Sequence, residues 1–120
     1  MAKYNILQEK SFEFAIKIVK LSKFLCEEKK EFVLSKQMLR SGTSIGANIE
    51  ESIGGQSDKD FLAKFSISYK ETRETIYWLK LLIATNYLDK EQTNTILQNA
   101  EEICKILAKI ILTTKQKLTS

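Results

Sequence analysis

Two carboxylates in the second half of the chain are the residues best suited to acid–base chemistry. Glu71 and Glu74 are three residues apart, which puts them side by side on a helix. Two neighbouring carboxylates can serve as the acid and the base of a hydrolysis reaction. Arg40, Asn48 and Glu51, in an earlier helical segment, could face these two carboxylates and their neighbours Lys70 and Arg73. The same side chains could instead pair with one another to fix how two helices pack, and we favour this structural interpretation because buried charges need partners.

The residue types present give little support for other kinds of catalytic site or for a metal site. Histidine is absent, which removes the most frequent acid–base catalyst and metal ligand. Helical bundles that bind two metal ions use Glu-x-x-His twice, and a zinc site needs four ligands, whereas the cysteines are only Cys26 and Cys104. We interpret both as buried free thiols, with a disulfide between them as the alternative. With no nucleophile–base pair and no cofactor-binding loop, the sequence predicts no enzyme, no metal and no cofactor.

Lysine side chains are the second group with a chemical use, because they can bind phosphate. Residues 1–49 and 103–120 each carry a net charge of +4, whereas residues 50–102 carry −4. The lysines that could contact nucleic acid are Lys17, Lys20, Lys23, Lys105, Lys109, Lys115 and Lys117. Such contacts would be independent of base sequence and weakened by salt. The alternative is that these lysines are only solvated helix ends.

Gly42 and Gly46 define the most distinctive segment of the chain. They are four residues apart and therefore lie on one face of a helix. A glycine inside a helix costs about 1 kcal/mol relative to alanine, and close packing of two backbones would compensate for that cost. A P-loop needs four residues between its glycines and a lysine after the second. We therefore interpret the segment as a tight helix crossing and reject a phosphate-binding loop.

Helices must position these residues, because the chain has no proline to interrupt them and only four glycines. Apolar residues recur at helical spacing in four segments, which predict helices at residues 11–28, 35–53, 57–85 and 89–114. We expect the side-chain caps at the helix starts to be Ser11, Ser35, Ser57 and Asp89. Gly54 and Gly55 should end the second helix in the left-handed conformation, and Asn86 should end the third.

The order and lengths of these segments predict how they pack. Loops of a few residues make successive helices antiparallel neighbours. A chain of 120 residues suits one hydrophobic core. The predicted fold is therefore a single all-α domain over residues 1–120, an antiparallel up-down-up-down four-helix bundle.

Apolar surface exceeds what one four-helix core needs. Residues 76–84 and 103–112 are apolar on nearly every side, and their outer faces hold little besides Lys80, Lys105 and Lys109. Exposed apolar surface usually marks an interface, so we predict a homo-oligomer that buries part of the first, third and fourth helices. A monomer with a large core is the alternative. No stretch is long enough to span a membrane, and the N-terminus has no secretory signal core, so we expect a cytoplasmic protein.

Two long motifs resemble the bacterial four helix bundle protein family, first noticed in open reading frames within intervening sequences of large-subunit ribosomal RNA genes. They are QMLRSGTSIGANIEE at residues 37–51 and YKETRETIYWLKLL at residues 69–82, the second including Trp78. Residues 60–61 also match, and residues 10–15 match more faintly. The resemblance covers about residues 10–112 and implies a four-helix bundle and a ring-like homopentamer. The chain is also similar to the accessory protein of diversity-generating retroelements, a basic pentameric barrel that partners a reverse transcriptase and RNA.

Together these observations predict a non-enzymatic, self-assembling helical bundle that acts as an RNA-binding accessory module. No RNA-recognition signature with stacking aromatic residues is present, so RNA would be recognised by its shape. The alternative is a protein–protein scaffold that binds no nucleic acid and whose partner docks on the oligomer.

Overall fold

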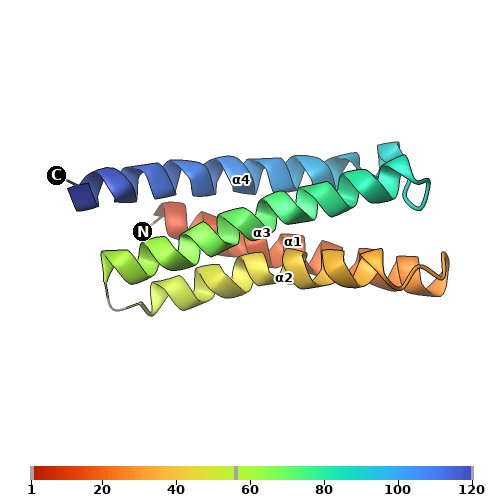
Figure 1. Ribbon diagram of the computed structural model, residues 1–120, viewed down its shortest axis with the longest axis horizontal. Helices are drawn as coiled ribbons and strands as arrows, with labels where there is room; N and C mark the ends of the chain where they lie inside the picture. The colour runs from red at the N-terminus through yellow and green to blue at the C-terminus, as the bar shows by residue number, and fades with distance from the viewer. Residues whose placement is uncertain (1, 56, 120) are drawn as a thin grey trace.

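The computed structural model describes residues 2–55 and 57–119, and in these residues it contains helices and no strand. The helices are α1 (Ala2–Glu27), α2 (Leu34–Ile53), α3 (Asp58–Ala84) and α4 (Lys90–Thr119). They lie side by side in a body of 50 × 22 × 21 Å, as Figure 1 shows. The predicted all-α class is confirmed.

Each helix packs on two neighbours, so that the helices form a closed square. Successive helices are antiparallel and adjacent, and α4 returns to contact α1 (Figure 1). The contact between α2 and α3 is the most extensive, and the contact between α1 and α4 is the least. Helices α1 and α3 are therefore diagonal partners and run in the same direction. This is the predicted up-down-up-down four-helix bundle.

The core consists of apolar side chains contributed by all four helices. Phe14, Ile18, Ile45, Phe65 and Leu107 are among its fully buried members. They recur at intervals of three, four or seven residues along their helices, the spacing that keeps one stripe of a helix against the core. Burial of this continuous stripe holds the helices together.

Helix α1 begins about nine residues earlier than predicted, and Ser11 does not cap it. Ser11 lies in the middle of α1, is 1% exposed, and its hydroxyl donates to the Gln8 carbonyl at 3.1 Å. Leu7, Phe14 and Ile18 continue the buried stripe through Ser11 without a break, so the helix has no reason to start there. Helix α4 likewise continues to Thr119, beyond the predicted end at residue 114.

The start of α2 is capped by Glu31 and not by Ser35. The Glu31 carboxylate accepts from the backbone N–H groups of Val33 at 3.2 Å, Leu34 at 3.1 Å and Ser35 at 2.7 Å. The Ser35 hydroxyl instead donates back to the Glu31 carbonyl at 2.7 Å. A carboxylate suits this position because the first N–H groups of a helix lack partners and carry partial positive charge. Glu31 is consequently only 7% exposed, although it belongs to a charged run.

The remaining helix ends follow the predicted chemistry with one exception. The Ser57 hydroxyl accepts from the Asp60 N–H at 3.2 Å, and the Asp89 carboxylate accepts from the Gln92 N–H at 3.1 Å. Asn86 has a φ of 67° just after α3, which is the left-handed stop expected there. The exception is Gly54, which has a φ of −86°, so the prediction of a left-handed glycine after α2 was wrong.

Candidate functional site

Arg40 of α2 connects the two carboxylates of α3. Its guanidinium donates to Glu71 at 3.1 Å through Nη1 and to Glu74 through Nη2. The Trp78 indole N–H also donates to Glu74, at 2.9 Å. Glu71 is shielded, with 13% of its side chain exposed. Both carboxylates therefore accept hydrogen bonds from donors of the protein, which is the arrangement of a structural cluster between α2 and α3.

Three other polar residues of the two motifs lie outside this cluster. The Asn48 amide donates to the Ser44 carbonyl of its own helix at 2.8 Å. Glu51 pairs with Lys64 of α3 at 2.9 Å, closer to the end of α2. Lys70 points to solvent. The structure thus brings together Arg40, Glu71 and Glu74, and it separates Asn48, Glu51 and Lys70 from them.

Buried hydroxyl groups add contacts between α2 and α3 that sequence reasoning missed. The hydroxyls of Ser41 and Thr75 form a hydrogen bond of 2.8 Å, and the Ser68 hydroxyl donates to the Ile45 carbonyl at 2.9 Å. All three hydroxyl residues are fully buried. These hydroxyl residues occur in the sequence at the helical spacing expected of core residues. That spacing could have predicted that they are buried. These bonds fix the relative height of the two helices.

The glycine pair of α2 faces α1. A Cβ atom added to Gly42 would lie 2.8 Å from Ile18 Cγ2, and one added to Gly46 would lie 3.3 Å from Ser11 Oγ. Ile18 and Ser11 are seven residues apart and lie on the same face of α1. The predicted close crossing therefore lies between α1 and α2, and it is tighter at Gly42.

The seven lysines proposed to bind nucleic acid form two groups and not one patch. A salt bridge of 2.7 Å between Lys10 and Glu102 sets the height of α1 against α4. Lys17, Lys20 and Lys23 follow Lys10 toward the end where α1 finishes and α4 starts. Lys105, Lys109, Lys115 and Lys117 follow Glu102 toward the opposite end. Lys17 is half-buried and the other six are exposed; Lys117 lies 3.7 Å from Asp58.

Two apolar surfaces lie on the outside of the bundle. The first, which we call the α1 stripe, consists of Phe12, Ile16 and Val19, all exposed, with Phe12 69% exposed. The second, which we call the α3–α4 groove, has a volume of about 390 Å³ and is lined by Arg73, Ile76, Tyr77, Lys80, Glu101 and Cys104. Tyr77 is 58% exposed. These surfaces lie on helices that the sequence predicts to be interfaces.

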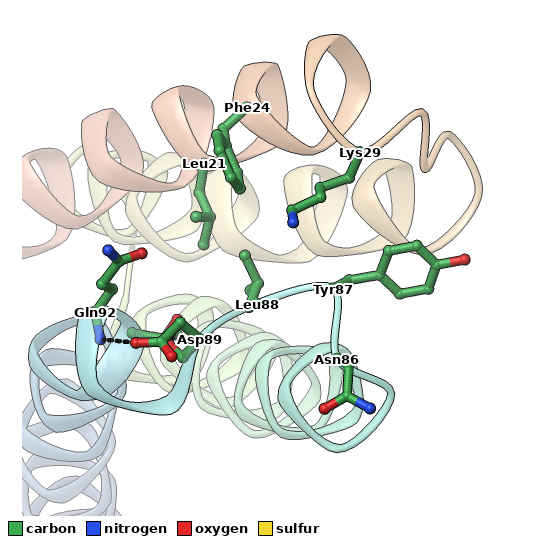
Figure 2. Close-up of a pocket in the computed structure, with 9 residues that line it drawn as sticks. Leu21, Phe24, Lys29, Asn86, Tyr87, Leu88, Asp89 and Gln92 are labelled. Carbon is green, nitrogen blue, oxygen red and sulfur yellow. Dashed lines mark hydrogen bonds between the residues drawn. The ribbon is translucent and has the colours of Figure 1, made fainter.

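Another hollow lies at the end of the bundle where α1 finishes and the α3–α4 loop turns. It has a volume of about 430 Å³, and Figure 2 shows Leu21, Phe24 and Leu88 gathered at its centre. Lys29 reaches over it, with its ammonium 5.9 Å from the centre of the Phe24 ring. The carboxylate in the lining, Asp89, already caps α4.

The thiols and carboxylates do not converge on a metal site in the described residues. Cys26 and Cys104 are both free and half-buried. The Cys26 sulfur lies 3.5 Å from the Ser35 hydroxyl, and burial raises the pKa of the Cys104 thiol. A raised pKa lowers the fraction of reactive thiolate. Among residues 2–55 and 57–119, no helix combines the length and apolar character that crossing a membrane requires.

Comparison with known proteins gives a consistent family assignment. No curated protein matches the chain. The structure is similar to the crystal structure of a protein of unknown function from the S23 ribosomal protein family of Bacteroides thetaiotaomicron, with 55% sequence identity and a TM-score of 0.89. That similarity covers 91% of this chain and 97% of the other. The chain matches the family described as 23S rRNA-intervening sequence protein over residues 3–109, and it belongs to that family.

Proposed function

We propose that this protein is a non-enzymatic helical bundle that assembles with copies of itself and serves as an accessory module for RNA. The observation that carries the self-assembly is the exposed apolar surface on the outside of α1, α3 and α4. Single exposed apolar residues are ordinary on a protein surface. The stripe of three on α1 and the exposed Tyr77 in the groove between α3 and α4 are two groupings of apolar side chains that an interface would bury. The family resemblance supports a homopentamer.

Self-assembly would also explain how modestly basic copies make a strongly basic particle. Each copy carries Lys105, Lys109, Lys115 and Lys117 along the second half of α4, from the middle of the bundle to one end. In a ring of parallel copies these groups would repeat around one rim. Repeated lysines at one rim would attract the phosphate backbone without reading its sequence.

Binding of the purified protein to a structured RNA, measured by fluorescence anisotropy over a salt series, tests the RNA role. We expect micromolar or tighter binding that weakens steadily with salt, and weakens further in the double variant Lys105→Glu, Lys109→Glu. Lys36→Glu with Lys70→Glu is the matched control, because these two lysines are also exposed and belong to neither group, and Lys36 lies at the start of α2, at the opposite end of the bundle from Lys117. No binding at low salt, or equal losses in both double variants, would contradict the RNA role.

A protein–protein scaffold is the second candidate, and a different surface favours it. Phe32 and Val33 are both exposed in the α1–α2 loop, at the end of the bundle. Contacts through the sides of α1, α3 and α4 would leave them uncovered. An apolar loop of this kind suits a protein partner better than a phosphate backbone. Loss of RNA binding with retention of self-assembly would favour this candidate.

A further inference from the structure

The hollow where α1 finishes and the α3–α4 loop turns, which we call the end hollow, has an apolar centre. Leu21 and Phe24 of α1 and Leu88 of the loop form this centre, as Figure 2 shows. Leu88 is buried, whereas Phe24 is 40% exposed. The volume of about 430 Å³ lies at the small end of the range for ligand pockets. The end hollow therefore suits one large apolar side chain with its backbone better than a longer segment.

Lys29 supplies a cation at one edge of the end hollow. Its ammonium lies 5.9 Å from the centre of the Phe24 ring, and within the part of the chain that the structure describes it forms no salt bridge. Its neighbours in the chain, Glu28 and Lys30, carry opposite charges, and neither lines the hollow. Beside an apolar surface, an ammonium attracts a carboxylate more strongly than it does in bulk water. This edge therefore favours a ligand that carries a carboxylate.

The polar groups at the opposite edge suit a peptide group. Figure 2 places Asp89 and Gln92 across Leu88 from the Lys29 ammonium. The Asp89 carboxylate accepts from the Gln92 backbone N–H at 3.1 Å, where the positive start of α4 balances part of its charge. The Gln92 side-chain amide extends toward α1 and makes no hydrogen bond within the described residues. An amide can pair with a peptide group, because each has a donor and an acceptor.

The charges of the lining favour a peptide over a nucleic acid. The lining contains one cation, Lys29, and one carboxylate, Asp89, so its net charge is zero. A phosphate backbone is bound through an excess of lysine and arginine, which the end hollow does not have. The end hollow also lies at the same end of the bundle as the α1–α2 loop, in which Phe32 and Val33 are exposed (Figure 1).

A carboxylate, a peptide group and an apolar side chain occur together on the last residue of a protein chain, where all three are joined to one Cα atom. Along an extended peptide, successive side chains point to opposite sides, so an acidic residue next to an apolar one would turn its carboxylate away from the hollow. The α-carboxylate of a C-terminal residue does not have this restriction. Capture of a C-terminal carboxylate is a recurring mode of peptide recognition.

We propose that the end hollow binds the C-terminus of a partner protein that ends in a large apolar residue. The apolar side chain lies among Leu21, Phe24 and Leu88, the α-carboxylate pairs with Lys29, and the last peptide group bonds to the Gln92 amide. This inference rests on the scaffold candidate and names what the partner presents.

Titration with N-acetylphenylalanine, a small model of such a C-terminus, tests the proposal. We expect the backbone amide resonances of residues 21–29 and 87–93 to shift in NMR spectra, with a Kd of about 1 mM for a ligand of this size. N-acetylphenylalaninamide lacks the negative charge and should bind about threefold more weakly. Lys29→Gln should make the two probes bind equally. Lys23→Gln, which replaces an exposed lysine of α1 outside the lining, should preserve the difference.

A third probe separates a peptide from a small apolar acid. The compound 3-phenylpropanoate has the ring and the carboxylate but no peptide group, so it should bind more weakly than N-acetylphenylalanine, and Gln92→Ala should remove that advantage. Equal binding of the two acids to the wild type would assign the hollow to a small apolar acid and overturn the peptide ligand.

Two further results would overturn the site itself. They are the absence of saturable shifts around the hollow, and equal binding of N-acetylphenylalanine and its amide to the wild type. Unchanged resonances elsewhere in each variant would show that its fold is intact. The scaffold candidate is decided separately by the RNA titration and by self-assembly, so its failure is distinguishable from failure of the end hollow.

Discussion

Helix α2 is held to its two neighbours by different physical means. Toward α1 it presents Gly42 and Gly46, and close approach of two surfaces provides the stabilisation. Toward α3 it presents hydroxyl groups and Arg40, and directional hydrogen bonds provide it. The first contact leaves no room for added atoms at Gly42, whereas the second depends on keeping both partners of each hydrogen bond. A mutation that adds atoms at Gly42 should therefore destabilise the contact with α1, and a mutation that removes a hydrogen-bonding group should destabilise the contact with α3.

The largest effect is expected on the α1 side at Gly42. In Gly42→Ala the new methyl group would lie 2.8 Å from Ile18 Cγ2, and Ile18 is fully buried and cannot swing away. Overpacking costs about 1–3 kcal/mol, and the fully buried neighbour places this site at about 3 kcal/mol, the upper end of that range. The better helix propensity of alanine returns about 1 kcal/mol, so we expect a net loss of about 2 kcal/mol in the free energy of unfolding. Urea unfolding measures it.

A double-mutant cycle checks the cause of that loss. Ile18→Ala removes the atoms that clash, so the effect of Gly42→Ala should become smaller when both changes are combined. Additive effects of the two changes would contradict a direct clash between these residues.

A smaller loss is expected on the α3 side from Arg40→Ala. This change removes the charged donor of two carboxylates, one of them mostly shielded from water. Because Arg40 itself is half exposed, we expect a loss of about 1–2 kcal/mol in unfolding free energy. Adding Glu71→Gln and Glu74→Gln to Arg40→Ala should recover part of it, since the unpaired negative charges are then gone. No recovery would show that the charges are not the cause.

The smallest effect, and one of opposite sign, is expected at Gly46. The added methyl group in Gly46→Ala would lie 3.3 Å from the Ser11 hydroxyl, which needs a shift of only a few tenths of an ångström. Alanine is favoured over glycine inside a helix by about 1 kcal/mol. We therefore expect Gly46→Ala to be neutral or stabilising by less than about 1 kcal/mol. A loss as large as that of Gly42→Ala would mean that the crossing is equally tight along its whole length.

The sequence predicted local features well, because their causes are local. The caps at Ser57 and Asp89 depend on the hydrogen bonds of one turn, and the apolar spacing identified the four helices. Ser11 misled because serine is typical both of caps and of close helix contacts. Glu31 was missed because a carboxylate in a charged run resembles solvated surface, and only the packing of the loop buries it against the first turn of α2.

Contacts between helices were harder to predict than the helices themselves. The spacing of Gly42 and Gly46 indicated a shared face but not that α1 lies against it. The lysines of α1 and α4 likewise carry the same charge, but because the two helices are antiparallel the two groups lie toward opposite ends of the bundle. Apolar periodicity shows which face of a helix is buried. It does not show which other helix packs against that face.

The mass of the wild-type protein in solution tests the central claim most directly. Light scattering at micromolar concentration should give a multiple of the 13.8 kDa chain mass, because the proposed self-assembly would bury the exposed apolar surface of α1, α3 and α4. A mass of 13.8 kDa at that concentration would contradict self-assembly.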